Sequence, residues 1–168
     1  ARELAELMVK IAEESGRKAV ALISDMNQPL GQAVGNALEV RESIETLKNH
    51  GPQDFVEHCL VVAAHMLALG GNVADYQAGR AVAEENLENG TAWEKFKTLI
   101  IAQGGDARYL ENPDLLPEAP LVEKLSATRS GYLKEIDARI VGETAVDLGA
   151  GRGKKGDSID HSVGIMKA

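Results

Sequence analysis

Hydrophobic and polar residues alternate with a helical period at the start of the chain. In residues 2–15 apolar positions recur every three or four residues and charged residues occupy the other face, which predicts an amphipathic helix that ends at Gly16. The next run, residues 18–24, is short and almost continuously apolar, as in a buried strand of a mainly parallel sheet. A helix, a tight turn and a strand in this order indicate a βαβ-type neighbourhood, although no other strands of such a sheet are evident.

Four further helices are predicted between residues 36 and 103. Asn36 and Glu39 stand three residues apart, as in a capping box that begins the first of them, and Thr91 and Glu94 repeat this spacing at the start of the fourth. The third, about residues 74–88, is interrupted by Gly79, which weakens its helical pattern.

The second of these helices, residues 52–69, is apolar nearly all round. Such a helix is expected at the centre of a core, because no face of it gains from contact with water. The pattern predicts one buried stripe that includes Cys59 and Met66. A cysteine on such a stripe is most simply a small apolar side chain, because a reactive thiol needs exposure and nearby positive charge.

The pattern changes beyond residue 105. Residues 106–120 contain three prolines, which interrupt regular structure and predict a linker. Short apolar runs at 121–127 and 132–136 predict two strands joined by a turn, followed by a helix at about 138–148, a glycine-rich loop and a strand at 162–166. We therefore expect an α/β fold that is helix-rich in its first two-thirds. Residues 1–105 form part of a central mixed helix–sheet domain, 106–120 a linker and 121–168 the start of a small C-terminal α+β segment.

Both ends of the chain predict a piece of a longer protein. The first helix is in full period directly after Ala1, and the last predicted strand stops within two residues of the C-terminus without a closing turn. We expect the C-terminal segment to be truncated.

Composition narrows the classes of function. The chain of 168 residues is 44% hydrophobic, enough for one domain or one domain with a small appended piece. Its net charge of −8 argues against a surface that binds nucleic acid. No apolar run approaches the roughly 20 residues that span a bilayer, so no membrane partner is expected. The single cysteine excludes an internal disulfide and a cysteine-rich zinc site, and favours the cytoplasm.

The glycine-rich loop at residues 149–156 is a candidate anion site. Its glycines let backbone amides approach a phosphate, and Arg152, Lys154 and Lys155 add positive charge. The loop lacks the glycine that the Walker spacing requires at Leu148, and it does not lead from a strand into a long helix. A solvated turn between a helix and a strand is the favoured interpretation.

The four histidines offer weaker candidates. His58 and His65 lie seven residues apart on one helix, too far to chelate one metal, so core histidines with hydrogen-bond partners are favoured. Asp160 and His161 could form an acid–base pair, but adjacent residues rarely point the same way in a strand and no nucleophile is evident.

The turn around Gly31 is the most specific feature of the chain. Asp25 and Glu42 flank it, and a turn with unpaired main-chain carbonyls beside a carboxylate is suited to a hard cation. The alternative is that Glu42 merely faces solvent.

Several stretches together resemble the pyrimidine-nucleoside phosphorylase and thymidine phosphorylase family. They are residues 22–31 with the sequence LISDMNQPLG, 35–42 with GNALEVRE, 102–106 with AQGGD, 131–132 with GY, 148–152 with LGAGR and 158–164 with SIDHSVG. The resemblance follows the family's order along essentially the whole chain.

The resemblance implies reversible phosphorolysis, in which inorganic phosphate attacks the anomeric carbon of a pyrimidine nucleoside and releases the base and a pentose 1-phosphate. It implies that the catalytic residues lie upstream of Ala1, in a phosphate-binding segment and a pyrimidine-binding set that this sequence lacks. The 168 residues would thus be an inactive fragment of a longer, homodimeric enzyme.

The resemblance also implies a potassium site. Its ligands in this chain would be the main-chain oxygens of Leu30 and Ala33 and the carboxylate of Glu42, and the remaining ligands would come from the phosphate-binding segment. Two alternatives stay open. One is a nucleotide phosphorylase or phosphoribosyltransferase of the same superfamily, and the other is a non-catalytic binding or regulatory module. The sequence does not distinguish a uridine from a thymidine substrate.

Overall fold

The structure, a computed structural model, describes residues 1–167. Helices dominate, and a two-stranded antiparallel sheet is the only sheet among these residues, which confirms the expected helix-rich mixed fold. The elements in chain order are α1 (Arg2–Glu14), β1 (Ala33–Val34), α2 (Asn36–Leu47), α3 (Gln53–Leu69), α4 (Tyr76–Glu88), α5 (Thr91–Ala102), α6 (Arg108–Glu111), the 3₁₀ helix η1 (Pro113–Leu115), α7 (Ala138–Asp147) and β2 (Ile165–Met166).

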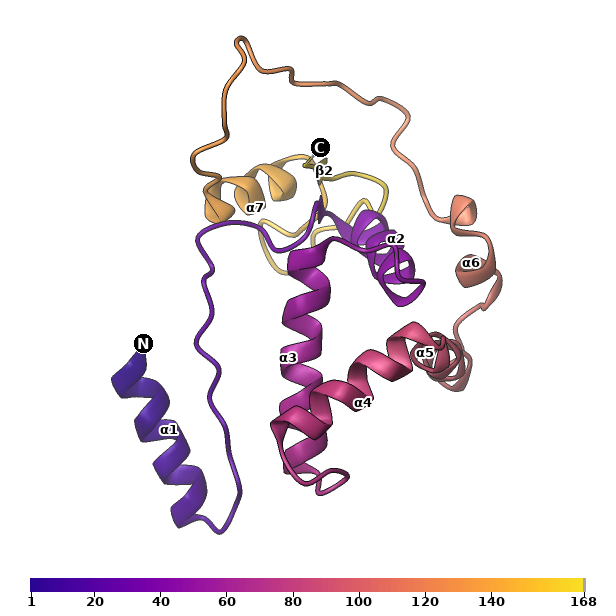
Figure 1. Cartoon of the computed structure of the whole chain (residues 1–168). Coiled ribbons are helices and arrows are strands. Elements are labelled where there is room, and N and C mark those ends of the chain that lie inside the picture. The colour runs from indigo at the N-terminus through magenta and orange to yellow at the C-terminus, as the bar shows by residue number, and fades with distance from the viewer. Residues whose placement is uncertain (168) are drawn as a thin grey trace.

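The predicted helices are all present, whereas three predicted strands are wrong. Residues 18–24, 121–127 and 132–136 form no strand. They run as extended, exposed chain, with Leu125 99% exposed. Figure 1 shows the first of these segments leading away from α1, and the other two in a long arc that reaches α7. A strand is stable only when a neighbouring strand completes its hydrogen bonds, and no described segment lies beside these three.

The last predicted strand is confirmed in part, because residues 165 and 166 form β2. It pairs antiparallel with β1, opposite to the parallel arrangement that the apolar run before the turn had indicated. Ala33 faces Met166 and Val34 faces Ile165, and the Lys167 N–H donates to the Gln32 carbonyl at 2.8 Å. The pairing places the C-terminal end of the described chain beside β1, far from α1 (Figure 1).

The core is small and centres on α2, α3 and α4. Ile44 and Ala64 are completely buried, and the other buried apolar residues are Ala33, Ala37, Leu60, Leu110 and Ala145. The predicted stripe of α3 is wrong in its position, because Cys59 is exposed and Met66 is 67% exposed. Helix α4 packs along the other side of α3, which buries Leu60 and Ala64 instead.

Gly79 explains how α4 approaches α3 so closely. A methyl group at this position would collide with the backbone of Ala64, so only glycine permits the contact. Beside it, Arg80 donates to both carboxylate oxygens of Glu57 on α3 at 2.6 Å and to Glu84 at 2.6 Å. These hydrogen bonds from Arg80 hold the pKa of Glu57 below its ordinary value.

Both predicted capping boxes are wrong. Gly35 is the N-cap of α2 and its N–H donates to Glu39 Oε1, while the amide of Asn36 reaches the Ala150 carbonyl at 2.8 Å. Gly90, with φ 79°, is the N-cap of α5. In both cases a preceding glycine adopts a backbone conformation that other residues avoid, and the cap moves one residue toward the N-terminus.

The predicted linker contains short regular elements, α6 and η1. It is tied back to α2, because Arg41 donates to Asp114 at 3.2 Å and to Glu118 at 2.7 Å. These contacts fix its path without testing whether it separates two domains, so the proposed domain limits stay a prediction.

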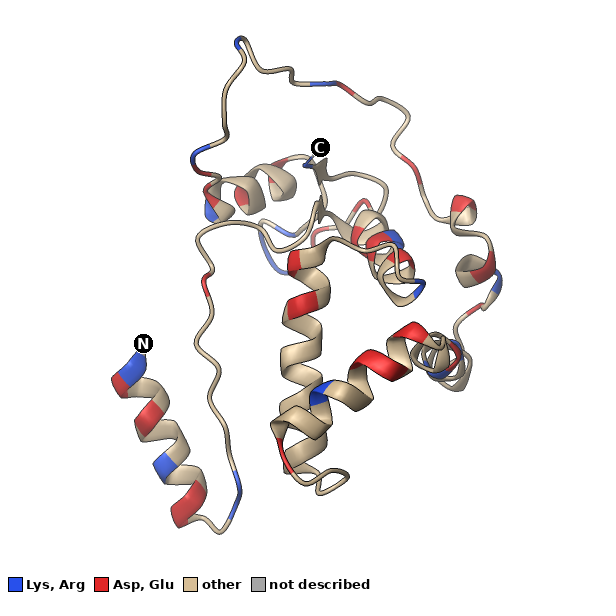
Figure 2. Cartoon of the chain, viewed as in Figure 1, with Lys and Arg blue, Asp and Glu red and all other residues tan. Residues whose placement is uncertain are grey.

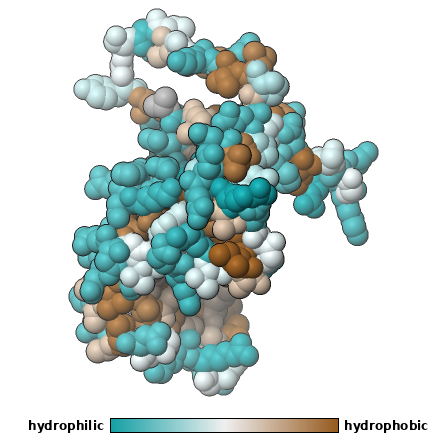
Figure 3. All heavy atoms as spheres, turned by 90° about the vertical axis from the view of Figure 1, so that its right-hand side faces the viewer, coloured by the Kyte–Doolittle hydropathy of each residue, from teal (hydrophilic) through white to brown (hydrophobic). Residues whose placement is uncertain are grey.

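The surface is acidic and mixed. Asp and Glu are spread over the helices, and Lys and Arg are scattered rather than gathered into one patch (Figure 2). Apolar side chains reach the surface in several separate areas (Figure 3). One set lies on α1, where Leu4, Leu7, Met8 and Ile11 are each more than half exposed. None of the described helices is both long and apolar enough to cross a membrane.

Candidate functional site

The turn that leads into β1, residues 27–32, is hydrogen-bonded to several other elements; we call it the Gly31 turn. At its start the Asn27 N–H donates to Asp25 Oδ1 at 2.8 Å, and the Asn27 carbonyl accepts from the N–H of Ala138 at the start of α7. At its end the Gln32 carbonyl accepts from Lys167. The turn therefore joins α7, β2 and β1.

Two carboxylates hold the centre of the Gly31 turn. Gly31 has φ 71°, a left-handed conformation that favours glycine. The Gly31 N–H donates to Asp54 Oδ2 at 3.2 Å, and the Gln32 N–H donates to Glu42 Oε1 at 2.8 Å. Consecutive backbone N–H groups in such a turn form a concave anion-binding surface, and here side chains from α3 and α2 supply the anions.

Glu42 does not merely face solvent. It is half-buried, and its Oε2 lies where a side chain on Gly31 would be. The structure thus brings the predicted ligand carboxylate onto the turn that carries Leu30 and leads into Ala33. Asp25, the other flanking carboxylate, bonds only locally to Asn27.

The two predicted carbonyl ligands lie on either side of the Gly31–Gln32 pair. Leu30 is 44% exposed and Ala33 is buried, with 4% exposed. Because Gln32 and Lys167 form a hydrogen-bonded pair, the next pair, Ala33 and Met166, is a non-hydrogen-bonded one, and the Ala33 carbonyl points away from β2. The set is made of oxygens alone, which fits a hard cation.

Asp54 was missed at the level of sequence. It stands second in α3, where an acidic residue is ordinary because the helix N-terminus favours negative charge. Its contact with Gly31 spans 23 positions of the chain, and no spacing rule links residues that far apart.

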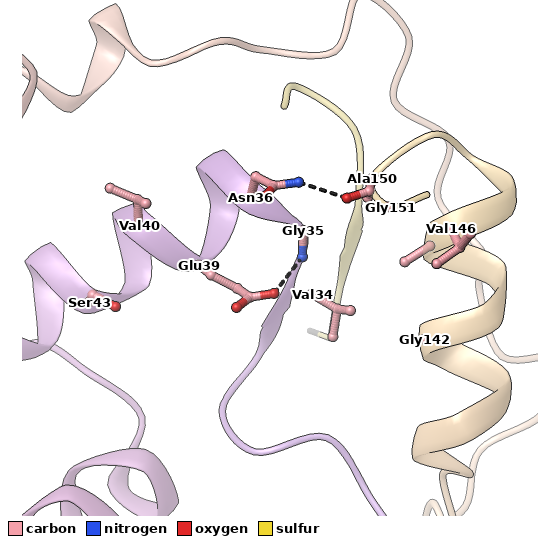
Figure 4. Close-up of a pocket in the computed structure, with 11 residues that line it drawn as sticks. Val34, Gly35, Asn36, Glu39, Val40, Ser43, Gly142, Val146, Ala150 and Gly151 are labelled. Atoms are coloured by element: carbon pink, nitrogen blue, oxygen red, sulfur yellow. Dashed lines mark hydrogen bonds between the residues drawn. The ribbon is translucent and has the colours of Figure 1, made fainter. Parts of the chain in front are cut away.

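A shallow cleft of about 520 Å³ lies next to the Gly31 turn, between the start of α2 and α7. Figure 4 shows Asn36 pointing across it to Ala150, with Glu39 folded back onto Gly35. Val34, Val40 and Val146 supply apolar walls. Two of the polar side chains that line the cleft, Asn36 and Glu39, are thus engaged in intramolecular bonds, and Ser43 is a third polar residue of the lining.

The glycine-rich loop behaves as the favoured interpretation predicts. Arg152, Lys154 and Lys155 are exposed, and the Lys154 N–H donates to the carboxylate of Asp157 at 2.9 Å. The backbone of the loop thus bonds to a carboxylate of its own segment.

Among the histidines, His50 pairs with Glu45 at 3.4 Å. His65 packs against Tyr76 with ring centroids 4.6 Å apart. Asp160 bonds to the hydroxyl and N–H of Ser162, which lowers the pKa of its carboxyl and leaves no hydrogen bond to His161 among those described. Partial burial raises the pKa of the Cys59 thiol, which disfavours the nucleophilic thiolate. No three His, Cys, Asp or Glu side chains of residues 1–167 gather as a metal-binding cluster.

Comparison with known proteins identifies the family of the chain. Residues 1–93 match the family model described as "Glycosyl transferase family, a/b domain", and residues 132–168 match "Pyrimidine nucleoside phosphorylase C-terminal domain". The first match covers more than half of the chain, so the chain belongs to this glycosyl transferase family.

Curated relatives match along nearly the whole chain. A pyrimidine-nucleoside phosphorylase of Geobacillus stearothermophilus is 47% identical over 166 residues, which cover 99% of this chain and 38% of the relative. Pyrimidine-nucleoside phosphorylases of Staphylococcus aureus strains bovine RF122 / ET3-1 and USA300 are each 44% identical over 166 residues, with the same coverage. The chain thus spans well under half the length of these relatives.

Proposed function

We propose that the full-length protein containing this chain catalyses the reversible phosphorolysis of pyrimidine nucleosides to the free base and a pentose 1-phosphate. The observation that carries the proposal is the 47% identity to a pyrimidine-nucleoside phosphorylase over 99% of the chain. Identity of this level across every described element, together with matches to both family models, supports a shared reaction.

The reaction requires groups that bind and orient both substrates, and the described residues supply only some of them. Phosphate must reach the anomeric carbon while positive charge develops on the sugar and negative charge on the departing pyrimidine, so catalysis rests on positioning and electrostatic stabilisation. We place the groups that bind phosphate and pyrimidine outside residues 1–168. The described chain contributes the Gly31 turn, which would brace the phosphate-binding segment.

We extend the proposal to a potassium ion held by the carbonyl oxygens of Leu30 and Ala33 and by Glu42. Support comes from the position of the Glu42 carboxylate against the turn and from the outward direction of the Ala33 carbonyl. When bound, the ion would supply positive charge beside the phosphate site. We also propose a cytoplasmic homodimer, on the basis of the family resemblance and the single cysteine.

The test of the activity uses the purified full-length protein. We expect release of uracil from uridine, of thymine from thymidine, or of both, only when inorganic phosphate is present, with one pentose 1-phosphate formed per base. Omission of phosphate is the control. Base release that needs no phosphate would point to hydrolysis and contradict the proposal.

The family model matched by residues 1–93 is broader than nucleoside phosphorolysis, which keeps a second candidate open. A nucleotide phosphorylase would act on the nucleoside 5′-monophosphate. The same assay with uridine and with its 5′-monophosphate separates the two, since a preference for the phosphorylated substrate would favour the second candidate.

A further inference from the structure

Asp54 accepts a hydrogen bond from the peptide unit that contains the Leu30 carbonyl, one of the proposed cation ligands. The Gly31 N–H, which donates to Asp54 Oδ2 at 3.2 Å, shares its peptide plane with the Leu30 carbonyl. A trans peptide is rigid and planar, and its N–H and C=O point in opposite directions. The bond to Asp54 therefore sets the direction of the Leu30 oxygen, on the side of the turn away from α3.

The second oxygen of Asp54 is anchored in its own helix. Its Oδ1 accepts from the Phe55 N–H at 3.0 Å, in the first turn of α3. The carboxylate is thus held between the N-terminal end of α3 and the turn. Because α3 packs in the core through Leu60 and Ala64, this helix provides a firm support for the turn.

Glu42 and Asp54 have different roles at the turn. Glu42 accepts from Gln32 and is itself a proposed ligand, whereas Asp54 accepts from Gly31 and lies on the opposite face of the Leu30 peptide from its carbonyl. Without Asp54 the Leu30–Gly31 plane would be free to rotate about the permissive Gly31 backbone.

We propose that Asp54 is a positioning residue of the potassium site, which orients the Leu30 carbonyl by holding the Gly31 N–H. This inference rests on the proposed function, since it assigns to Asp54 a role in the cation site of that enzyme. Asp54 touches neither the cation nor the substrate.

The test uses three variants of the full-length protein. Asp54→Ala removes the acceptor, and Asp54→Asn keeps one acceptor oxygen without the charge. Asp75→Ala is the matched control, because Asp75 is also an acidic residue at a helix start, where it accepts the Ala78 N–H at 2.9 Å, but it does not bond to the turn.

The first readout is the potassium concentration that gives half of the maximal rise in thermal midpoint, measured at constant ionic strength. For Asp54→Ala we expect this concentration to increase about tenfold, the size expected for loss of one charge-assisted hydrogen bond. Asp54→Asn should lie between Asp54→Ala and the wild type, and Asp75→Ala should match the wild type even if its midpoint is lower throughout. The turnover number at saturating potassium should stay within about twofold of wild type, since the machinery for phosphorolysis is intact.

The second readout is amide hydrogen exchange in the segment of residues 28–34. We expect about tenfold faster exchange at Gly31 in Asp54→Ala and no change in Asp75→Ala. Unchanged exchange, or a potassium response equal to that of Asp75→Ala, would overturn the role of Asp54. A wild-type protein whose midpoint ignores potassium would overturn the cation site and this inference with it, whereas the proposed phosphorolysis is judged separately by base release.

Discussion

At the scale of single residues, Gly31, Asp54 and Glu42 hold the turn on which the proposed cation site depends. Gly31 provides a left-handed conformation, and Asp54 and Glu42 each take one of two consecutive N–H groups. Because the N–H and C=O of a trans peptide point in opposite directions, the Leu30 carbonyl is directed away from Asp54. A turn held in this way can present main-chain oxygens without rearranging when a cation binds.

The charge of Glu42 is the first property to test at this scale. In Glu42→Gln the side-chain oxygen can still accept from Gln32, but the negative charge that would attract potassium is lost. We expect a clearly smaller rise of the thermal midpoint of the full-length protein across a potassium titration than in wild type. Glu45→Gln is the control, because Glu45 lies on the same helix, is exposed and pairs only with His50 at 3.4 Å. If Glu42→Gln and Glu45→Gln respond to potassium alike, Glu42 is not a ligand.

At the scale of elements, α3 and α4 form the best-packed unit of the chain. Their contact depends on Gly79, which lies against the backbone of Ala64, and on Arg80, which joins Glu57 to Glu84. Helix propensity and helix packing therefore have opposite requirements at Gly79. Glycine weakens an isolated helix, but here it allows two helices to approach.

Gly79→Ala measures which of these two effects is larger. Alanine favours a helix by about 1 kcal/mol over glycine, whereas overpacking a tight contact costs about 1–3 kcal/mol. We expect a net loss of stability, seen as a lower thermal midpoint. Gly142→Ala in α7 is the matched control, since a methyl group there meets no atom within 4 Å and should stabilise the protein. An increase in midpoint for both variants would show that α4 does not need the close approach to α3.

At the scale of the whole molecule, much apolar surface of the described chain is exposed. Leu4 and Met8 on α1 are 61% and 62% exposed, and Ile23 in the following extended segment is 56% exposed. The chain spans 38% of the length of its curated relatives. We therefore expect activity to depend on more than these 168 residues.

Residues 1–168 produced alone are therefore expected to release no uracil or thymine in the presence of phosphate. The full-length protein in the same assay is the positive control, and circular dichroism should show that the isolated chain retains helix. Phosphate-dependent base release by the isolated chain would refute the view that its catalytic groups lie elsewhere.

The sequence by itself determined the helices and the family. Helical periodicity is local, so α1, α3 and α7 were predicted to within about two residues of their observed limits. The N-cap position depends on which of several neighbouring residues adopts the cap conformation. Gly35 and Gly90, rather than Asn36 and Thr91, are the N-caps of α2 and α5. The motifs around Gly31 carried the resemblance, and the proposed ligands Leu30, Ala33 and Glu42 lie close together in the chain.

Only the tertiary structure decided which apolar runs become strands and what holds the Gly31 turn. Residues 18–24 have the composition of a buried strand, but a strand is defined by hydrogen bonds to a partner that composition does not name. Asp54 likewise carries no local mark of its contact with Gly31, because the contact arises only when α3 packs beside the turn. Local periodicity is a property of neighbouring residues, whereas the support of the Gly31 turn depends on segments that meet in space. For this reason the turn was recognised from the sequence but its contact with α3 was not.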